Sequence, residues 1–166
     1  MFNDIKMDIL SVGGNRIKVF LTNRGFHALL FYRIANKLSR IKVPLLPLIL
    51  TRIIQIIYSI DIDYRATIKG GCTIVHGVGL VIGKGAIIGK NAKLYHGVTL
   101  GISHSQSKSD GFPLIGDNVI IGSGAKLLGK IKIGDNVKIG ANSVVTHDVP
   151  SNSTAFGIPA VIKTKP

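Results

Sequence analysis

The chain has 166 residues, a length that suits one domain with a substantial apolar core. Its formal net charge is +13 and it contains no glutamate, so we expect an anionic partner such as a nucleotide phosphate or an anionic lipid surface. Nucleic acid is not among the expected partners, because no nucleic-acid-binding motif accompanies this charge. The single cysteine, Cys72, cannot form an internal disulfide, and the first residues lack a signal-peptide pattern. We therefore expect a cytoplasmic protein.

Residues 1–60 are expected to form a helical segment ahead of the main domain. Residues 1–14 end in two glycines and are expected to be loosely ordered. Residues 15–40 place apolar side chains at helical spacing on one side and basic side chains on the other, which predicts a basic amphipathic helix or helix pair. Residues 48–60 are nearly all apolar. An arginine and a glutamine within them argue against a membrane span and favour a helix that is buried or lies on a membrane.

This helical segment has two candidate contacts. Nine lysines and arginines against two aspartates give residues 1–60 a net charge of +7. A basic apolar segment of this kind can bind anionic lipid at the inner face of the cell membrane. A contact between subunits, with the charged side in solvent, explains the same pattern, and both interpretations stay open.

Residues 61–149 carry a repeat with a period of six, which is neither the helix period nor the strand alternation. A small residue commonly stands two positions before the aliphatic residue of each repeat, and a glycine often follows it. This pattern suits a short strand followed by a tight corner. Three such strands would close one coil of about eighteen residues, so the repeat predicts a parallel β-helix. The repeating aliphatic residues are Ile62, Ile68, Ile74, Ile82, Ile88, Leu94, Leu100, Ile115, Ile121, Leu127, Ile133, Ile139 and Val145.

Two segments are expected to leave this repeat. Residues 102–113 are rich in serine, glycine and polar side chains, which predicts a loop that projects from the coil. Long loops on a rigid scaffold commonly carry function. Residues 150–166 are expected to leave the coils as a C-terminal tail with a basic end.

Two histidines occupy equivalent positions in the repeat. His76 and His96 each stand two residues after a repeating aliphatic residue, and a Gly-Val pair follows each of them. One coil separates them, so they are expected to stack on the same corner. Histidine is the natural general base for removing a hydroxyl proton. Such a base needs a partner that orients it, and Asp61, with Asp63 as its competitor, lies near the same edge one coil below.

The hexapeptide pattern resembles the left-handed β-helix acyltransferases, and the sense of the coil is implied only by that resemblance. Four motifs resemble the serine acetyltransferase branch of this family. They are the DI at residues 61–62, the His-Gly at 76–77, the polar loop and the closing GIPA at 157–160. The helical GFHALLFYRIA is similar to the same branch, so the resemblance covers residues 24–166. It implies a mainly β fold, a left-handed parallel β-helix with a short N-terminal helical segment. It also implies a homotrimer with active sites between subunits, and acetyl-CoA as co-substrate without a metal.

The resemblance also assigns roles to individual residues. In that branch the histidine matching His76 deprotonates the acceptor hydroxyl, and the aspartate matching Asp61 orients this histidine. His96 is implied to line the acceptor site. Contacts to acetyl-CoA, largely through backbone groups, map onto Gly101, Ser103, Ser123, Lys138 and Ala141. Charges for the 3′-phosphate and pyrophosphate are offered by Lys126, Lys138, Lys163 and Lys165.

Three positions depart from the serine acetyltransferase pattern. That branch carries an aspartate before the catalytic histidine and an Arg-His pair in the loop, which bind the ammonium and carboxylate of serine. Here these positions are Val75, Gly111 and Phe112, and a zwitterion without charged partners would bind poorly. Phe112 would instead pack against a sugar ring. This pattern resembles the O-acetyltransferases of bacterial exopolysaccharide, capsule and O-antigen synthesis, so we expect acetyl transfer to a sugar hydroxyl of a surface polysaccharide or its precursor.

Three alternatives remain open. The first is a serine O-acetyltransferase, against which the missing charged contacts argue. The second is a metal-dependent β-helix hydratase, which needs three histidine ligands where the repeat offers only His76 and His96. The third is a non-catalytic trimeric scaffold whose basic helix binds a membrane enzyme.

Overall fold

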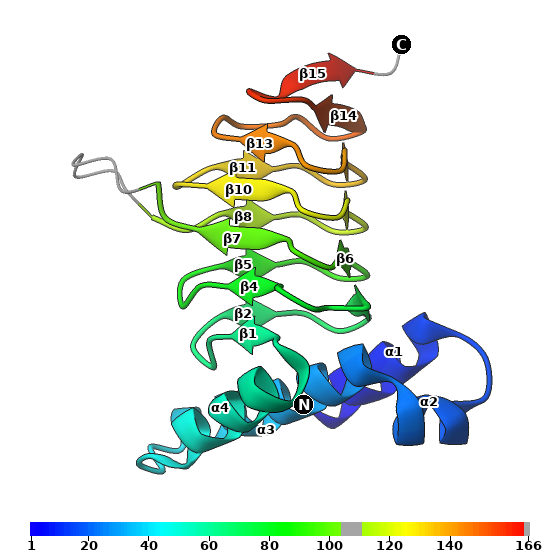
Figure 1. The fold of residues 1–166 in the computed structure, drawn as a ribbon, viewed down its shortest axis with the longest axis vertical. Helices are drawn as coiled ribbons and strands as arrows, with labels where there is room; N and C mark the ends of the chain where they lie inside the picture. Colours follow the sequence, from blue (N-terminus) through cyan, green and yellow to red (C-terminus); the bar gives the residue numbers. More distant parts are fainter. Residues whose placement is uncertain (104–110, 165–166) are drawn as a thin grey trace.

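The computed structural model describes residues 1–103 and 111–164. In these residues a column of flat coils stands on a group of helices (Figure 1). The helices are α1 (Phe2–Val12), α2 (Arg16–Thr22), α3 (Arg24–Arg40) and α4 (Leu46–Tyr58). The strands are β1 (Asp61–Ile62), β2 (Thr67–Ile68), β3 (Thr73–Val75), β4 (Val81–Ile82), β5 (Ile87–Ile88), β6 (Lys93–Tyr95), β7 (Thr99–Gly101), β8 (Leu114–Ile115), β9 (Ile120–Ile121), β10 (Lys126–Leu128), β11 (Lys132–Ile133), β12 (Lys138–Ile139), β13 (Val144–Val145), β14 (Ser153–Phe156) and β15 (Val161–Thr164).

The strands form the three sides of the coil, and this confirms the predicted parallel β-helix. One sheet has the order β1-β4-β7-β10-β13, the second β2-β5-β8-β11, and the third runs from β3 through β6, β9 and β12 to β14. These neighbours pair in parallel, so each coil contacts only the coils above and below it. Every aliphatic residue of the six-residue repeat is buried, because it points into the narrow core between the three sheets.

One corner of the coil is held by a ladder of asparagines. Asn91, Asn118, Asn136 and Asn152 all have positive φ, a conformation that asparagine tolerates better than most residues. Each side-chain amide donates to the carbonyl oxygen of the next asparagine up the column, at 3.0–3.1 Å. The corner therefore keeps both its backbone turn and its side-chain hydrogen bonds from coil to coil.

The C-terminal segment differs from the expected tail. Strand β14 pairs in parallel with β12 and so adds one more level to the third sheet. Strand β15 then turns back and pairs antiparallel with β14. This antiparallel strand covers the edge that the last parallel strand would otherwise leave open.

The four helices pack beneath the first coil. Helices α2 and α3 are the predicted helix pair, and Asn23 caps α3 by accepting a hydrogen bond from the Phe26 N–H. Helix α4 packs on α3 and β1, but it leaves apolar side chains such as Ile49, Ile56 and Ile57 exposed. No helix in the described residues is long and apolar enough to cross a membrane. Binding to an anionic membrane surface stays a prediction.

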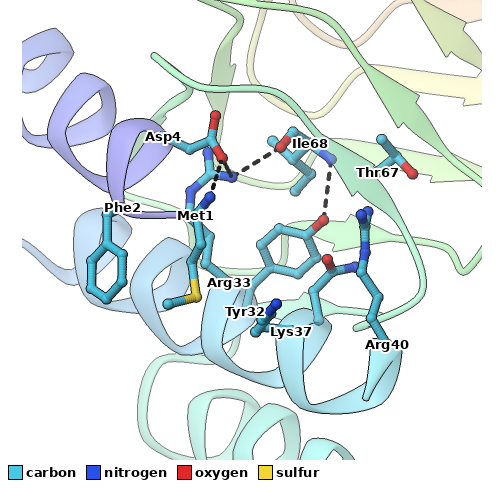
Figure 2. A pocket seen from close by; sticks show the side chains of 10 residues that line it. Met1, Phe2, Asp4, Tyr32, Arg33, Lys37, Arg40, Thr67 and Ile68 are labelled. Atoms are coloured by element: carbon cyan, nitrogen blue, oxygen red, sulfur yellow. Dashed lines mark hydrogen bonds and ion pairs between the residues drawn. The ribbon is translucent and has the colours of Figure 1, made fainter. Parts of the chain in front are cut away.

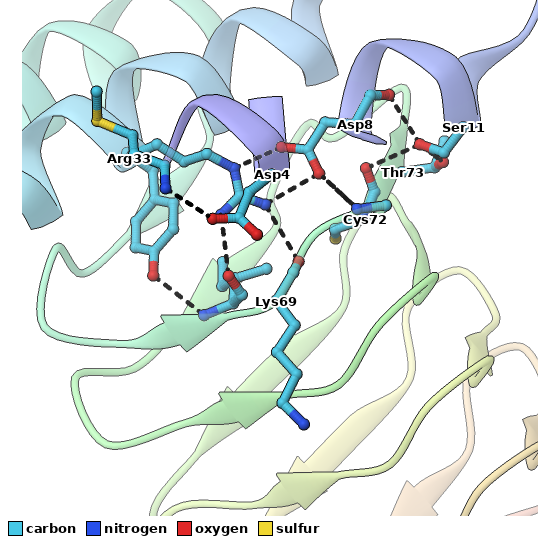
Figure 3. A network of polar contacts seen from close by, with 11 residues as sticks. Asp4, Asp8, Ser11, Arg33, Lys69, Cys72 and Thr73 are labelled. Atoms are coloured by element: carbon cyan, nitrogen blue, oxygen red, sulfur yellow. Dashed lines mark hydrogen bonds and ion pairs between the residues drawn. The ribbon is translucent and has the colours of Figure 1, made fainter. Parts of the chain in front are cut away.

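The helices and the first coil do not close completely. A cavity of about 410 Å³ remains between α1, α3 and β2 (Figure 2). Beside it, a group of polar side chains joins α1 and α3 to the coil (Figure 3).

The prediction that residues 1–14 are loosely ordered is wrong. Residues 2–12 form α1, and Asp8 at its centre is buried. The Asp8 carboxylate accepts hydrogen bonds from Arg33 Nε at 2.5 Å and Nη2 at 2.9 Å, and from the backbone N–H groups of Gly71 and Cys72. Arg33 in turn donates to the carbonyl oxygens of Ile68 and Lys69. These charge-assisted hydrogen bonds order α1 although its own sequence is a weak helix signal.

The Cys72 thiol is expected to be unreactive in the native protein. It is fully buried, and burial, with the nearby charge of Asp8, raises its pKa to about 12. A raised pKa keeps the thiol protonated at pH 8, and only the thiolate is an effective nucleophile. Alkylation by iodoacetamide at pH 8, followed by mass spectrometry, should therefore modify Cys72 only after denaturation. Complete modification of the folded protein within minutes would contradict this.

Candidate active site

The predicted stacking of the two histidines is confirmed. Val75 of β3 pairs with Tyr95 of β6, so the next residues, His76 and His96, share one corner of adjacent coils. Their ring centroids are 6.3 Å apart in an edge-to-face arrangement, and both side chains are exposed. Two imidazoles thus face solvent at neighbouring levels of the same corner.

The same corner continues upward through two predicted cofactor contacts. The Gly124 N–H donates to the His96 carbonyl, which places Ser123 above His96. The Asn142 N–H donates to the Ser123 carbonyl, which places Ala141 one level higher. We call His76, His96, Ser123 and Ala141 the corner column. Within the described residues, the N–H groups of Ser123 and Ala141 have no hydrogen-bond acceptor, so two unpaired backbone donors lie at this corner above the imidazoles.

Strand β3, which leads into His76, is held from below by α3. Gly25 in the first turn of α3 packs directly against the Ile74 carbonyl, and any side chain at this position would collide with that backbone. The Asp8–Arg33 pair holds the residues just before β3 from the other side. The base of the corner column is therefore fixed by two helices.

Asp61 does not contact His76 in the single chain. Its carboxylate accepts a 3.1 Å hydrogen bond from Gln55 Nε2 of α4, and the Arg52 guanidinium donates to the same Gln55 side chain. Among the residues that the structure describes, no hydrogen bond or ion pair joins Asp61 to His76. Its role as the orienting partner stays a prediction.

The competitor, Asp63, is engaged elsewhere. Its carboxylate accepts two hydrogen bonds from the Arg65 guanidinium, at 2.7 and 2.9 Å, and one from the Arg65 backbone N–H. Burial alone would raise the pKa of Asp63, but these hydrogen bonds outweigh it and lower that pKa. Asp63 therefore has a partner of its own and is a poor candidate for orienting His76.

Lys126 lies closer to the histidines than the sequence pattern indicated. The strand register aligns it above Thr99 and, two levels further down, Asp61. Its Nζ donates to the Gly97 carbonyl at 2.6 Å and to Thr99 Oγ1 at 3.1 Å. The ammonium is thus fixed beside the residue that follows His96, and one of its three N–H donors remains for a ligand.

The remaining predicted cofactor lysines come together at the last coils. Lys138 pairs with Thr154, and Thr154 pairs with Lys163, so two exposed lysines flank one threonine on the outer face of the third sheet. The predicted contacts Gly101 and Ser103 lie at the end of β7, and Ser103 sits beside Gly129. Lys165 and His104 lie outside the described residues.

The three departures from the serine acetyltransferase pattern have different surroundings. Val75 is half-buried on the outer face of β3. Gly111 lies against the Lys130 side chain. Phe112 packs on Gly83 and Gly85, where any side chain would overlap its ring, and it is half-buried against the core. Phe112 therefore anchors the end of the loop on the coil, and its role in binding an acceptor stays a prediction.

The two histidines of the corner column do not belong to a metal site in the described part of the chain. The described residues contain no group of three histidine, cysteine or acidic side chains close enough to hold one ion. His76 and His96 alone do not match the three protein ligands of a catalytic zinc site.

A family model described as bacterial transferase hexapeptide (six repeats) matches residues 112–147. Together with the fold, this match places the chain among the hexapeptide-repeat transferases.

The relatives define the family more closely. The serine acetyltransferase of Helicobacter pylori strain 26695 is 43% identical over 151 residues, which are 91% of this chain and 88% of that protein. The serine acetyltransferase of Synechococcus elongatus is 43% identical over 145 residues, and there the chain spans only 59% of the relative's length. The chain belongs to the serine acetyltransferase family, which confirms the predicted acyltransferase class.

Solved structures agree with this assignment. Serine acetyltransferase from Brucella abortus in complex with coenzyme A superposes with a TM-score of 0.93 at 34% identity, over 99% of this chain and 68% of that one. The Neisseria gonorrhoeae enzyme in complex with serine gives a TM-score of 0.91 at 34% identity, over 98% and 69% of the two chains. These findings give no support to the expected polysaccharide O-acetyltransferase branch, and they favour the alternative of serine.

Proposed function

We propose that this protein transfers the acetyl group of acetyl-CoA to the hydroxyl of L-serine. The observation that carries the proposal is the corner column, in which two exposed imidazoles lie below two free backbone N–H groups. The acyl donor and the acceptor are taken from the relatives, one of which was solved with coenzyme A and another with serine.

His76 is the general base in this proposal. It removes the hydroxyl proton as the serine oxygen attacks the acetyl carbonyl, and proton transfer to a positioned imidazole accelerates such a step. When the C–S bond of the thioester breaks, the imidazolium returns this proton to the leaving coenzyme A thiolate. A backbone N–H at the corner stabilises the negative charge that develops on the carbonyl oxygen. Transfer is direct, because the buried thiol of Cys72 cannot reach a substrate. Asp61 orients His76 only after its hydrogen bond with Gln55 rearranges.

The acyl donor runs up the corner column. The N–H groups of Ser123 and Ala141 donate to amide carbonyls of the pantetheine arm. His76 follows β3, and Lys138 lies in β12, three strands further up the same sheet. Three strand-to-strand spacings give a rise of about 14 Å, and Lys163 in β15 lies higher still. This distance separates the thioester, at the histidines, from the phosphates, at the lysines. The exposed corner leaves one wall of the site open, so we expect a neighbouring subunit of a homotrimer to close it.

Lys126 is assigned to the acceptor in this arrangement. Its ammonium is fixed beside His96, where the thioester and the hydroxyl meet, and the long pantetheine arm keeps the phosphates away from this point. A lysine here can pair with the carboxylate of serine and so offsets the loss of charge at Gly111 and Phe112.

An acceptor panel tests the proposed function. Thiol release from acetyl-CoA is measured with purified protein, with L-serine and separately with hexoses, N-acetylhexosamines and glycan fragments. Saturable turnover with serine, and none with the sugars, is the expected result. Turnover with a sugar alone would overturn the serine assignment. That result would support the hypothesis that the acceptor is a sugar hydroxyl, which Val75 and Phe112 favoured in the sequence analysis.

The Lys126→Met variant is expected to raise the KM for L-serine by about 10–100-fold, the effect of removing one hydrogen bond to a charged group. Its KM for acetyl-CoA should stay within about twofold, because the ammonium lies far from the phosphates. The matched control is Lys138→Met, which should show the reverse pattern. Steady-state kinetics with each substrate varied in turn separates the two. If Lys126→Met raised only the KM for acetyl-CoA, the lysine would bind the cofactor phosphates, as the sequence predicted, and not the acceptor.

A further inference from the structure

The cavity beneath the first coil lies apart from the corner column. Its walls come from α1, from the C-terminal half of α3 between Tyr32 and Arg40, and from β2 of the second sheet (Figure 2). His76, His96 and Lys126 do not line it. Its volume of about 410 Å³ is in the range that holds small organic ligands.

Positive charge dominates this cavity. Lys37 and Arg40 are exposed, lie one turn apart on α3 and line the cavity. In the described part of the chain neither side chain has a hydrogen-bond or ion-pair partner. The third cation, Arg33, lies deeper and is already paired with Asp8. Asp4, the carboxylate among the lining residues, lies 3.9 Å from the same guanidinium.

Two of the neutral polar side chains of the walls, Tyr32 and Asn36, already have partners within the protein. The Tyr32 hydroxyl donates to the Ala66 carbonyl and accepts from the Ile68 N–H. The Asn36 amide donates to the carbonyl oxygens of Tyr64 and Ala66. The cavity therefore still offers a ligand the two cations Lys37 and Arg40, the Thr67 hydroxyl and an apolar rim, at which the Phe2 side chain is largely exposed.

We propose that this cavity is a binding site for a small organic anion, a carboxylate or phosphate carried on an apolar body. Lys37 and Arg40 pair with the anionic group, since charge-assisted hydrogen bonds are the strong ones. The apolar body lies against Phe2 and the adjoining wall of α1. Neither the relatives' acyl donor nor serine accounts for this site, because it opens beneath the second sheet and not at the histidine corner.

Binding here is expected to stabilise the junction between helices and coil. Arg33, at the floor of the cavity, links α3 and α1 to the backbone of residues 68 and 69. A ligand with its anionic group at Lys37 and Arg40 of α3 and its apolar body on Phe2 of α1 links these two helices. A ligand that binds only the folded state raises the stability of that state.

The probe is phenyl phosphate, titrated by calorimetry into the wild-type protein in the presence of saturating coenzyme A, which fills the proposed acyl-donor site. We expect one site per chain, a rise in Tm, and no binding of phenethylamine, a cationic probe of similar shape. Inorganic phosphate is expected to bind more weakly, because it lacks the apolar body. Equal binding of the cationic probe, or no binding of phenyl phosphate, would overturn the proposal.

Variants locate the site. Lys37→Ala/Arg40→Ala should weaken phenyl phosphate binding by about tenfold or more and leave thiol release with serine unchanged. The matched control is Arg24→Ala/Lys132→Ala, which removes the same two charges from exposed positions away from the cavity and should bind like wild type. Both double variants alter exposed side chains, so their unliganded Tm values should match that of wild type. If both lose binding equally, the probe responds to net charge alone and the cavity is not the site.

Discussion

Replacing His76 with alanine is expected to lower kcat/KM for acetyl transfer to serine by about 10²–10⁴-fold, the usual contribution of a general base. The variant is expected to fold, because the imidazole is exposed and packs edge-to-face on the ring of His96. The His76 backbone has a φ of 63°, in the left-handed region, so alanine at this position costs some stability. Thiol release at saturating acetyl-CoA measures the loss. The KM for acetyl-CoA should change little, since the N–H groups of the corner column are untouched.

His96→Ala is the matched control for this prediction. It removes the other imidazole of the pair from the same corner one coil higher, where the backbone, unlike that of His76, does not have a positive φ. We expect a smaller loss that falls mainly on the KM for the acceptor. If His76→Ala kept near-wild-type activity, or if His96→Ala were the more damaged variant, His76 would not be the base.

Replacing Asp8 with alanine is expected to lower the free energy of unfolding by about 3–5 kcal/mol, the cost of leaving a buried charge without its partner. Asp8 and Arg33 are both almost fully buried. Burial alone would lower the pKa of Arg33, but the hydrogen bond and charge of Asp8 outweigh it and raise that pKa. Arginine remains charged after the substitution, so the penalty cannot be relieved by losing a proton. Urea unfolding followed by circular dichroism measures the change.

A double variant separates the ion pair from its position in the fold. Asp8→Leu/Arg33→Met removes both charges together, and replacement of a buried pair by apolar residues is often close to neutral. We expect the double variant to be clearly more stable than Asp8→Ala. The single variants Asp8→Leu and Arg33→Met complete the cycle. If their effects on the free energy of unfolding simply added up to that of the double variant, the pair would be energetically uncoupled, and α1 would be held by other contacts.

The coil and the histidine pair follow from sequence because both depend on a short, regular period. Each strand from β1 to β13 contributes one buried aliphatic residue, so the period of six gives the sheets and their register without long-range information. That register places His76 beside His96, and their rings lie 6.3 Å apart as a consequence.

Contacts between the helices and the coil could not be read from periodicity. Asp8 and Arg33 are 25 residues apart and pair only after both helices have docked. Arg33 did carry a signal of a buried ion pair, because it is a charged residue on the otherwise apolar side of its helix. The roles of Gln55 and Thr99 carried no such signal, since each depends on where one neighbouring coil or helix places its partner.

The expected acceptor shows the limit of reasoning from a few positions. Val75, Gly111 and Phe112 lack the charges of the serine acetyltransferase pattern, and this favoured a sugar. Similarity over 88% of the Helicobacter pylori enzyme favours the serine alternative in spite of these three positions. Lys126 supplies a charge beside Gly97, next to His96, that a linear pattern did not reveal. Phe112 also has a structural reason to be aromatic, because its ring fills the space above Gly83 and Gly85.

The most direct test of the central claim is to identify the product. Purified protein is incubated with acetyl-CoA and L-serine, and the mixture is analysed by NMR and mass spectrometry, with His76→Ala as the negative control. O-acetyl-L-serine should accumulate in step with free coenzyme A in the wild type and be strongly reduced in the variant. Release of coenzyme A without O-acetyl-L-serine, or acetylation of an added sugar in preference to serine, would contradict the account.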